Sequence, residues 1–384
     1  MRKLVFSIFV AVLAASILFV SCSQDPAKPS SYTIKFNANG GTGTMEEMVV
    51  SNGDSVALPR GTFTSAEGNQ FVGWNTKSDY TGDIYTDEEK FVPQSDLTLY
   101  AQWVPKDFFK VVDGELQRGS GFDALALKNN LAIPKYIDGE KVTSFKNGAI
   151  GGMGMMSVYG LYQECYYLKA VSIPDSVVSI GDYAFKRCYA MTSVSLPDTI
   201  TSIGNSSFSE CYNLETIDLP EALETIGGSA FSDCHLLDSV LMPDSVKTIG
   251  SSAFSNCRSL TTITLPENIT GISGYLFDRC TNLKQVTIKG ELESIGVLAF
   301  RYNSALKSFT IPATVTTIAT AAFYTCNGLE ALYINASTPP ALGNDEVFDN
   351  GSDCPIYVPA DSVEAYKTAG GYWDEYADRI QAAK

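Results

Sequence analysis

The feature that most constrains the fold is a pattern that recurs every 23 residues between positions 162 and 334. An aromatic residue marks each unit, at Tyr162, Phe185, Phe208, Phe231, Phe254, Phe277, Phe300 and Phe323. Three positions later stands a small residue, at Cys165, Cys188, Cys211, Cys234, Cys257, Cys280, Asn303 and Cys326. Apolar residues then alternate with polar ones, which predicts a β-strand with one buried face.

One unit of this size has too few apolar side chains to offset the conformational entropy that folding removes. Stacked units can pair their strands and close their aromatic and apolar positions into one core. We therefore expect a mainly β chain with short helical or turn segments, in which a solenoid of 23-residue coils occupies residues 161–335.

Composition excludes two classes of function. The formal net charge is −16 and there is no basic run, so binding to the phosphates of nucleic acid has no electrostatic basis. The single histidine, His235, follows Cys234 at a repeat position whose residue type varies from unit to unit, as expected of a surface site. We expect no catalytic residues, no enzyme activity and no cofactor.

The N-terminus reads as an export signal over residues 1–21, with Arg2 and Lys3 ahead of an apolar run. The run ends at Cys22, and the segment resembles a bacterial lipoprotein signal, which implies that Cys22 carries lipid. An ordinary cleaved signal and an uncleaved anchor are the alternatives. Residues 22–31 contain Pro26 and Pro29 and read as a disordered tether. We expect an exported, lipid-anchored protein of the bacterial cell envelope, at the outer-membrane cell surface.

Residues 32–103 form a separate β-rich stretch. The phrases FNANGG, FVGWNTK and LTLYAQW resemble the Listeria–Bacteroides repeat of bacterial surface proteins, which is similar to the internalin B repeat and implies a β-grasp-like fold. We interpret Trp74 and Trp103 as core aromatics; a carbohydrate platform made by both is the alternative.

The repeats, written AFxxCxxLxxVxLPxxxxxIG, resemble the Bacteroides surface protein A type of leucine-rich repeat. The resemblance implies a leucine-rich-repeat solenoid, with residues 336–384 as its C-terminal cap. Residues 105–160 are expected to form the N-terminal cap and an irregular first coil, in which the methionine-rich residues 151–156 are a distorted turn or a mobile flap. Members of this family are exported or surface-attached, and some are adhesins for host extracellular proteins.

The cysteine positions are expected to hold free, buried thiols that form hydrogen bonds with backbone groups of the loops. Side chains at equivalent positions of successive coils point in parallel and not at one another. Asn303 fits this interpretation, since it is also small and forms hydrogen bonds. Disulfides are the alternative, since adjacent strands lie within the Cα distance that a disulfide spans. Acids near the turn read as a solvated stripe, with Ca²⁺ binding as the alternative; they are Asp175, Asp198, Glu221, Asp244 and Glu267. We expect no metal site.

The candidate ligand-binding surface is a row of side chains directly after the cysteines. Tyr166, Tyr189 and Tyr212 should stack there, with His235 and Arg258 continuing the row. Leu241 is the one apolar residue on a polar strand face. Tyrosine and arginine are residues that anchor protein interfaces.

These features favour a non-enzymatic, lipid-anchored surface protein that binds an extracellular or cell-surface protein, as an adhesin does. Two alternatives stay open. One is a structural or periplasmic envelope lipoprotein without a host ligand, and the other is a glycan-binding module.

Overall fold

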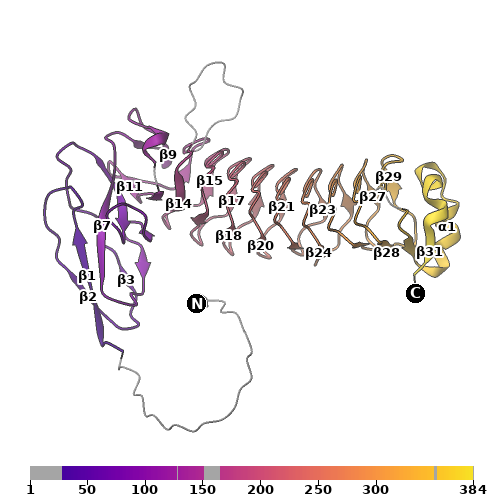
Figure 1. The fold of residues 1–384 in the computed structure, drawn as a ribbon, viewed down its shortest axis with the longest axis horizontal. Helices are drawn as coiled ribbons and strands as arrows, with labels where there is room; N and C mark the ends of the chain where they lie inside the picture. The colour runs from indigo at the N-terminus through magenta and orange to yellow at the C-terminus, as the bar shows by residue number, and fades with distance from the viewer. Residues whose placement is uncertain (1–27, 128, 151–164, 350–352, 384) are drawn as a thin grey trace, which may run out of the picture.

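The computed structural model describes residues 28–127, 129–150, 165–349 and 353–383. A small β module lies at one end, a row of coils follows, and short helices close the other end (Figure 1). The predicted signal, Cys22, most of the tether, Tyr162 and the methionine-rich segment lie outside the described residues. Within the part that is described, no helix is both long and apolar enough to cross a membrane.

The N-terminal module is a five-stranded mixed sheet in the order β2-β1-β7-β4-β5, in which β1 and β7 are parallel. Its strands are β1 (Ser31–Asn37), β2 (Met48–Ser51), β4 (Gln70–Asn75), β5 (Ile84–Tyr85) and β7 (Leu97–Val104), and β3 (Val56–Ala57) pairs with β6 (Lys90–Phe91). Trp74 is fully buried beneath this sheet and its Nε1 donates to Pro59 O at 3.2 Å. Trp103 is partly buried and donates to Ala38 O at 2.9 Å. A carbohydrate platform made of both rings is therefore wrong, because Trp74 has no exposed face.

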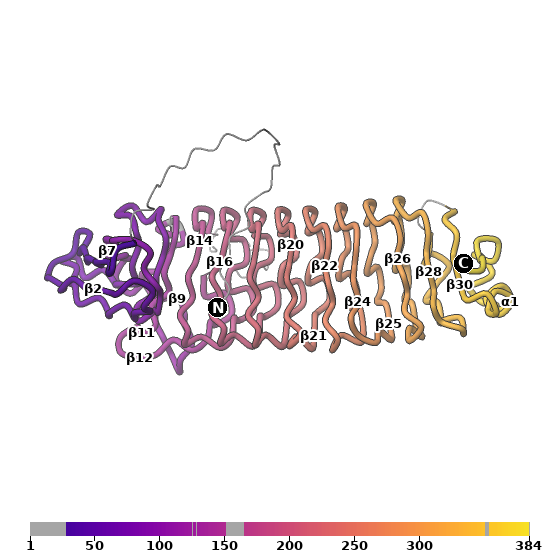
Figure 2. Tube along the Cα trace, turned by 90° about the horizontal axis from the view of Figure 1, so that it is seen from below, coloured from indigo at the N-terminus to yellow at the C-terminus, as the bar shows by residue number. Residues whose placement is uncertain are grey.

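The coils form a regular row (Figure 2), and each contributes a strand to a first line of parallel strands. This line carries the predicted alternating pattern, and neighbouring strands pair with a shift of 23 residues, as in Ile263 opposite Val286. It contains β10 (Asn129–Ala132), β14 (Leu168–Ser172), β16 (Ser193–Ser195), β18 (Thr216–Asp218), β20 (Ser239–Leu241), β22 (Thr262–Leu265), β24 (Gln285–Ile288), β26 (Ser308–Ile311), β28 (Ala331–Ile334), β30 (Ile356–Val358) and β31 (Ile380–Ala382).

A second line of two-residue strands runs along another side of the coils, which the sequence pattern does not predict as strand. Its pairing keeps the same shift, as in Ile295 opposite Ile318. It contains β13 (Ser144–Phe145), β15 (Ser179–Ile180), β17 (Ser202–Ile203), β19 (Thr225–Ile226), β21 (Thr248–Ile249), β23 (Gly271–Ile272), β25 (Ser294–Ile295), β27 (Thr317–Ile318) and β29 (Ala341–Leu342).

Phenylalanine rings stack through the centre of the coils. From Phe185 to Phe323 the centroids of successive rings are 5.1 to 6.2 Å apart. All of these rings are fully buried. Phe348 continues the stack at 5.9 Å from Phe323, although two more residues separate it from the ring before it than in the other coils.

The side chains at the cysteine positions of the repeat, from Cys165 to Cys326 with Asn303 among them, join each coil to the one before it, and we call them the ladder. Cys234 Sγ donates to Phe208 O at 3.3 Å, and Cys257 Sγ donates to Phe231 O at 3.2 Å. Asn303 makes the same bond with its amide, to Phe277 O at 2.8 Å. The eight cysteines among the described residues are buried and form no disulfide with one another. Burial raises the pKa of the Cys326 thiol to about 12, so this side chain stays a protonated donor at neutral pH.

Both ends of the row are covered. At the N-terminal end, β8 (Phe109–Val112) and β9 (Glu115–Arg118) form a hairpin, and β9 pairs with β13 of the second line. This end also contains a short 3-10 helix at Ala124–Ala126 and a second hairpin of β11 (Tyr136–Ile137) and β12 (Glu140–Lys141). At the other end lie α1 (Val363–Lys367) and the 3-10 helices Ala360–Ser362 and Gly371–Arg379. Trp373 is buried there and donates to Pro340 O at 2.9 Å.

The N-terminal module is docked on the first coil rather than held on a free linker. Ala132 N donates to Gln102 Oε1 at 2.9 Å, and Lys135 N donates to Asp87 Oδ1 at 2.7 Å. Val72 of the module belongs to the same buried cluster as the solenoid core. Gly73 makes this approach possible, since a Cβ there would overlap Ala132 Cβ and lie 2.7 Å from Tyr85 O.

Replacing Asn303 with cysteine should stabilise the protein. Among the described residues Asn303 Oδ1 is buried without a hydrogen-bond partner, and cysteine removes this oxygen while keeping the donor. We expect Asn303→Cys to raise the free energy of unfolding by about 1 kcal/mol. Cys234→Ala removes the thiol bond to Phe208 O, which keeps its bond from Cys211 N, and leaves a small cavity, so it should lower the free energy of unfolding by about 1–3 kcal/mol. Urea unfolding measures both, and a less stable Asn303→Cys variant would contradict this role of the ladder.

Adding a methyl group at Gly73 should loosen the contact between the module and the first coil. We expect Gly73→Ala to lower the free energy of unfolding by about 1–3 kcal/mol, as overpacking does. The double variant Gly73→Ala/Ala132→Gly should recover the part caused by Ala132. Thermal unfolding of the three proteins tests this, and equal melting temperatures would show that the two parts do not pack as described.

Candidate functional site

The residues directly after the ladder cysteines form a row of stacked rings on one corner of the solenoid. The centroids of Tyr166 and Tyr189 are 5.3 Å apart, and those of Tyr189 and Tyr212 are 5.0 Å apart. His235 stacks on Tyr212 at 4.8 Å, with 5° between the ring planes. Tyr166 is 48% exposed and the next three rings are partly exposed. We call Tyr166, Tyr189, Tyr212 and His235 the ring row.

A repeated backbone conformation turns these rings outward. The residue before each cysteine has a left-handed backbone, with φ of 63° at Arg187, 61° at Glu210 and 62° at Asp233. This conformation costs about 1–2 kcal/mol for a non-glycine residue. Hydrogen bonds between coils offset the cost, as in Arg187 N to Ser209 O at 2.9 Å and Glu210 N to Ser232 O at 2.8 Å.

Cys234 and His235 therefore lie in a turn and not in a strand. Cys234 is fully buried, whereas His235 is partly exposed beside Tyr212. The thiol is already engaged with Phe208 O, and burial raises its pKa well above the ordinary value. A thiolate nucleophile with His235 as its base has no support in this geometry.

The acids near the ring row are engaged by neighbouring side chains. Glu210 accepts a hydrogen bond from Arg187 Nε at 3.0 Å and lies 3.6 Å from Lys186 Nζ. Burial, and then the nearby carboxylate of Glu210, raise the pKa of Tyr212, which keeps its hydroxyl protonated. Asp233 Oδ1 lies 3.6 Å from His235 Nε2. The row therefore presents aromatic faces with polar edges, next to acids that already have partners.

Arg258 and Leu241 differ in how they relate to the row. Arg258 occupies the next position, where its Nε donates to Asn256 Oδ1 at 2.9 Å. Leu241 is 82% exposed on β20, on the first strand line. In the part of the chain that the structure describes, no ring or hydrogen-bond contact joins Leu241 to the row. The predicted ligand-binding residues thus form one row on the corner, and Leu241 is a separate exposed apolar side chain on the strand face.

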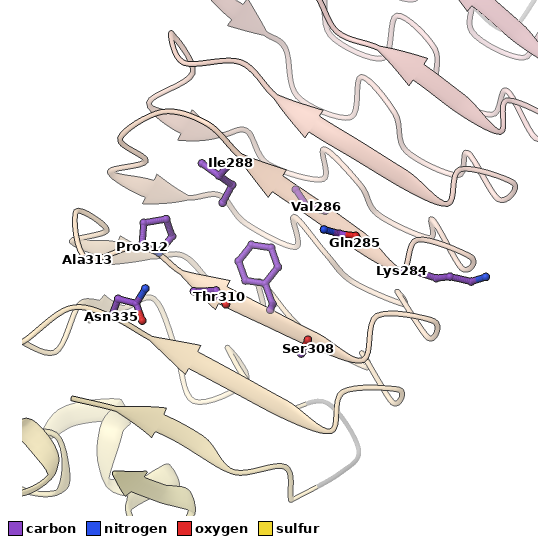
Figure 3. A pocket seen from close by; sticks show the side chains of 10 residues that line it. Lys284, Gln285, Val286, Ile288, Ser308, Thr310, Pro312, Ala313 and Asn335 are labelled. Atoms are coloured by element: carbon purple, nitrogen blue, oxygen red, sulfur yellow. The ribbon is translucent and has the colours of Figure 1, made fainter. Parts of the chain in front are cut away.

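The strand face also carries a groove that the sequence interpretation missed. No strand pairing joins β24 to β26; the first line is also interrupted between β16 and β18, and the second between β21 and β23. A cavity of about 520 Å³ lies over the break between β24 and β26, and Figure 3 shows Val286 and Ile288 on one strand and Ser308 and Thr310 on the next. Phe309 is buried where most coils have valine, isoleucine or leucine, and its ring packs 4.9 Å from Phe300.

The acidic stripe is spread over successive coils and partly engaged in ion pairs. Asp175 lies 3.0 Å from Lys135, and Asp244 lies 2.6 Å from Lys289. Across the described ranges, no three carboxylate, thiol or imidazole groups converge as a metal site would require.

Comparison with known families matches both parts of the chain. The BspA type Leucine rich repeat region matches residues 159–257 and 225–351, in six copies, and the Listeria-Bacteroides repeat domain matches residues 32–102. None of the curated proteins is similar enough to match.

Several solved structures are similar. The Leucine Rich Repeat protein of T. pallidum has 30% sequence identity over 53% of this chain and 90% of its own, with a TM-score of 0.45. A leucine-rich repeat protein from Bacteroides ovatus has 26% identity over 65% of this chain and 69% of its own, with a TM-score of 0.49. A leucine rich cell surface protein from Faecalibacterium prausnitzii has 21% identity over 78% and 71%, with a TM-score of 0.41.

The repeat match covers half of the chain and coincides with the coils, the phenylalanine stack and the thiol ladder. The chain therefore belongs to the BspA-type leucine-rich-repeat family and carries a Listeria–Bacteroides repeat domain ahead of its repeats.

Proposed function

We propose that this protein is a non-enzymatic, lipid-anchored surface protein whose ring row binds an extracellular or cell-surface protein, as an adhesin does. The observation that carries the proposal is the row itself: four rings stacked across four coils, exposed on one corner and held in register by the buried ladder. Repeat proteins of this family are surface or envelope proteins, and leucine-rich repeats generally bind other proteins.

Stacking makes the row suitable for a protein ligand. A tyrosine has few rotatable bonds, and contact with neighbouring rings restricts it further. Binding a ligand therefore costs little side-chain conformational entropy. Each ring offers apolar area and a polar edge, the combination found at the centre of protein interfaces. The row extends over four coils, each of which adds one ring to it.

Lipid attachment at Cys22 would hold the row close to a membrane, and on the outer face of the envelope the row would meet extracellular proteins. The residues from Cys22 to position 28 would then act as a tether between the lipid and the module, whose first strand begins at Ser31 and whose Asn52 donates to Pro29 O and Ser30 O. The docked module would hold the solenoid at a fixed distance from that tether, because it shares buried contacts with the first coil.

Removing two rings should remove protein binding. The protein without residues 1–21 is immobilised and used to capture partners from an extracellular-matrix and plasma extract, in parallel with Tyr189→Ser/Tyr212→Ser. We expect the captured partner to bind the variant at least tenfold more weakly, as for loss of an interface hot spot.

The matched control is Tyr333→Ser/Tyr357→Ser, which removes another stacked pair, 5.1 Å apart, on the last strands of the first line. This control should keep full binding. Equal loss in both variants, or none in the first, would place the binding surface elsewhere than the ring row.

The anchor has its own test in cells. Wild-type protein should take up labelled palmitate and be removed from intact cells by added protease, because it is attached outside by lipid. Cys22→Ala should take up no label and should leave the membrane fraction. Protection of the wild-type protein from protease in intact cells would instead favour a periplasmic envelope component.

A further inference from the structure

The corner that carries the ring row changes character beyond His235. The next coils place Arg258, Arg279 and Arg301 there, together with Tyr302. A cavity of about 410 Å³ lies along this part of the corner. We call it the arginine groove; its lining includes Asn256, Arg258, Arg279, Thr281, Tyr302 and Ser304.

One of the three arginines is fully engaged by a buried acid. Arg301 donates from Nε and Nη2 to the two carboxylate oxygens of Asp278, at 2.7 and 2.8 Å. The side chain of Asp278 is only 7% exposed. These hydrogen bonds raise the pKa of Arg301, and its guanidinium also lies 5.3 Å from the ring of Tyr302. Both carboxylate oxygens of Asp278 therefore accept their short hydrogen bonds from Arg301.

The other two arginines keep their charge available. Arg279 lies 5.0 Å from the centre of the Tyr302 ring, is 52% exposed, and approaches a carboxylate only at 3.7 Å, from the Asp278 that Arg301 already holds. Arg258 is exposed and is oriented through its Nε by Asn256. Arg279 and Arg301 therefore share the carboxylate of Asp278, Arg258 is held by an amide, and no acid is among the described residues that line the groove.

This positive site stands out in a chain of net charge −16. At physiological salt, charges farther away than about 8 Å are largely screened, so a bound anion would sense mainly the nearby guanidinium groups. Contact with Tyr302 and Asn256 also holds the two forks in place before a ligand arrives, which reduces the entropy lost on binding.

We infer that the arginine groove binds an anionic saccharide, one whose sugar units carry carboxylate or sulfate groups. Arginine forks match the paired oxygens of both groups. Hydroxyl and amide side chains make up most of the remaining lining and suit the hydroxyl groups of a sugar. A protein segment is less well served, because the described lining contains no leucine, isoleucine, valine or phenylalanine and guanidinium groups lie against the Tyr302 ring.

Calorimetry with defined oligosaccharides tests the inference. The protein without residues 1–21 is titrated with a heparin-derived hexasaccharide, a galacturonate hexamer and neutral maltohexaose. We expect one or both anionic sugars to bind, more weakly as NaCl rises, and the neutral sugar to give no signal. The heparin fragment tests sulfate and the galacturonate hexamer tests carboxylate, so the pair identifies the anionic group.

Variants locate the binding. Arg258→Gln/Arg279→Gln should weaken it at least tenfold. Lys247→Gln/Lys307→Gln removes the same charge from exposed side chains that pair with Glu224 and Glu330 elsewhere, and should leave it unchanged. Thermal unfolding checks that each variant is folded, and Asn256→Ala, which frees Arg258 without removing charge, should weaken binding by a smaller factor.

The inference does not depend on the protein ligand of the ring row, so Tyr189→Ser/Tyr212→Ser should bind the oligosaccharide normally. Binding of neither anionic sugar, equal binding of maltohexaose, or an equal effect of the lysine variant would overturn it. Binding of hexaglutamate in place of both sugars would also overturn it, by showing that the groove takes protein carboxylates.

Discussion

The structure depends on hydrogen bonds that each coil can make only with its neighbours. The two strand lines form such bonds, and so do the turns that precede the cysteines, as in Arg187 N to Ser209 O. The ladder adds a bond from a thiol or amide to a buried carbonyl. A coil alone would leave these groups unpaired and its phenylalanine ring exposed. The two ends face the same problem, which the docked module solves at one end and the helical cap at the other.

The same constraint explains what could be predicted from sequence. The 23-residue period predicts the strand, the phenylalanine stack and the row of thiols. In a solenoid, residues at the same position of successive repeats lie next to one another. The period also predicts that Tyr189, Tyr212 and His235 stack. The acceptors of the thiols could not be predicted, because a carbonyl is present at every residue and only the path of the chain selects Phe208 for Cys234.

Other features escaped prediction because they depend on departures from the repeat. Phe309 is one apolar residue among similar ones, and its sequence position does not reveal that β24 and β26 are left unpaired. Asp278 and Arg301 occupy the same position in adjacent coils, which is a usable signal once charges are compared coil by coil. Gly73 lies within a strand of the module, and its role is visible only when Ala132 is placed against it. The corner is free to vary in this way because its side chains leave the core, so rings and arginines can follow one another on one backbone.

The ladder has a consequence for how such a protein can change in length. From Cys211 to Cys326 its bonds join residues that are 26 positions apart. The entropy lost in closing a loop grows only with the logarithm of loop length, and over these coils that length is constant. Adding a coil by duplication therefore repeats a closure step that the chain already performs, without introducing a longer-range one. An exposed corner can thus gain or lose recognition positions one at a time while the core is copied unchanged.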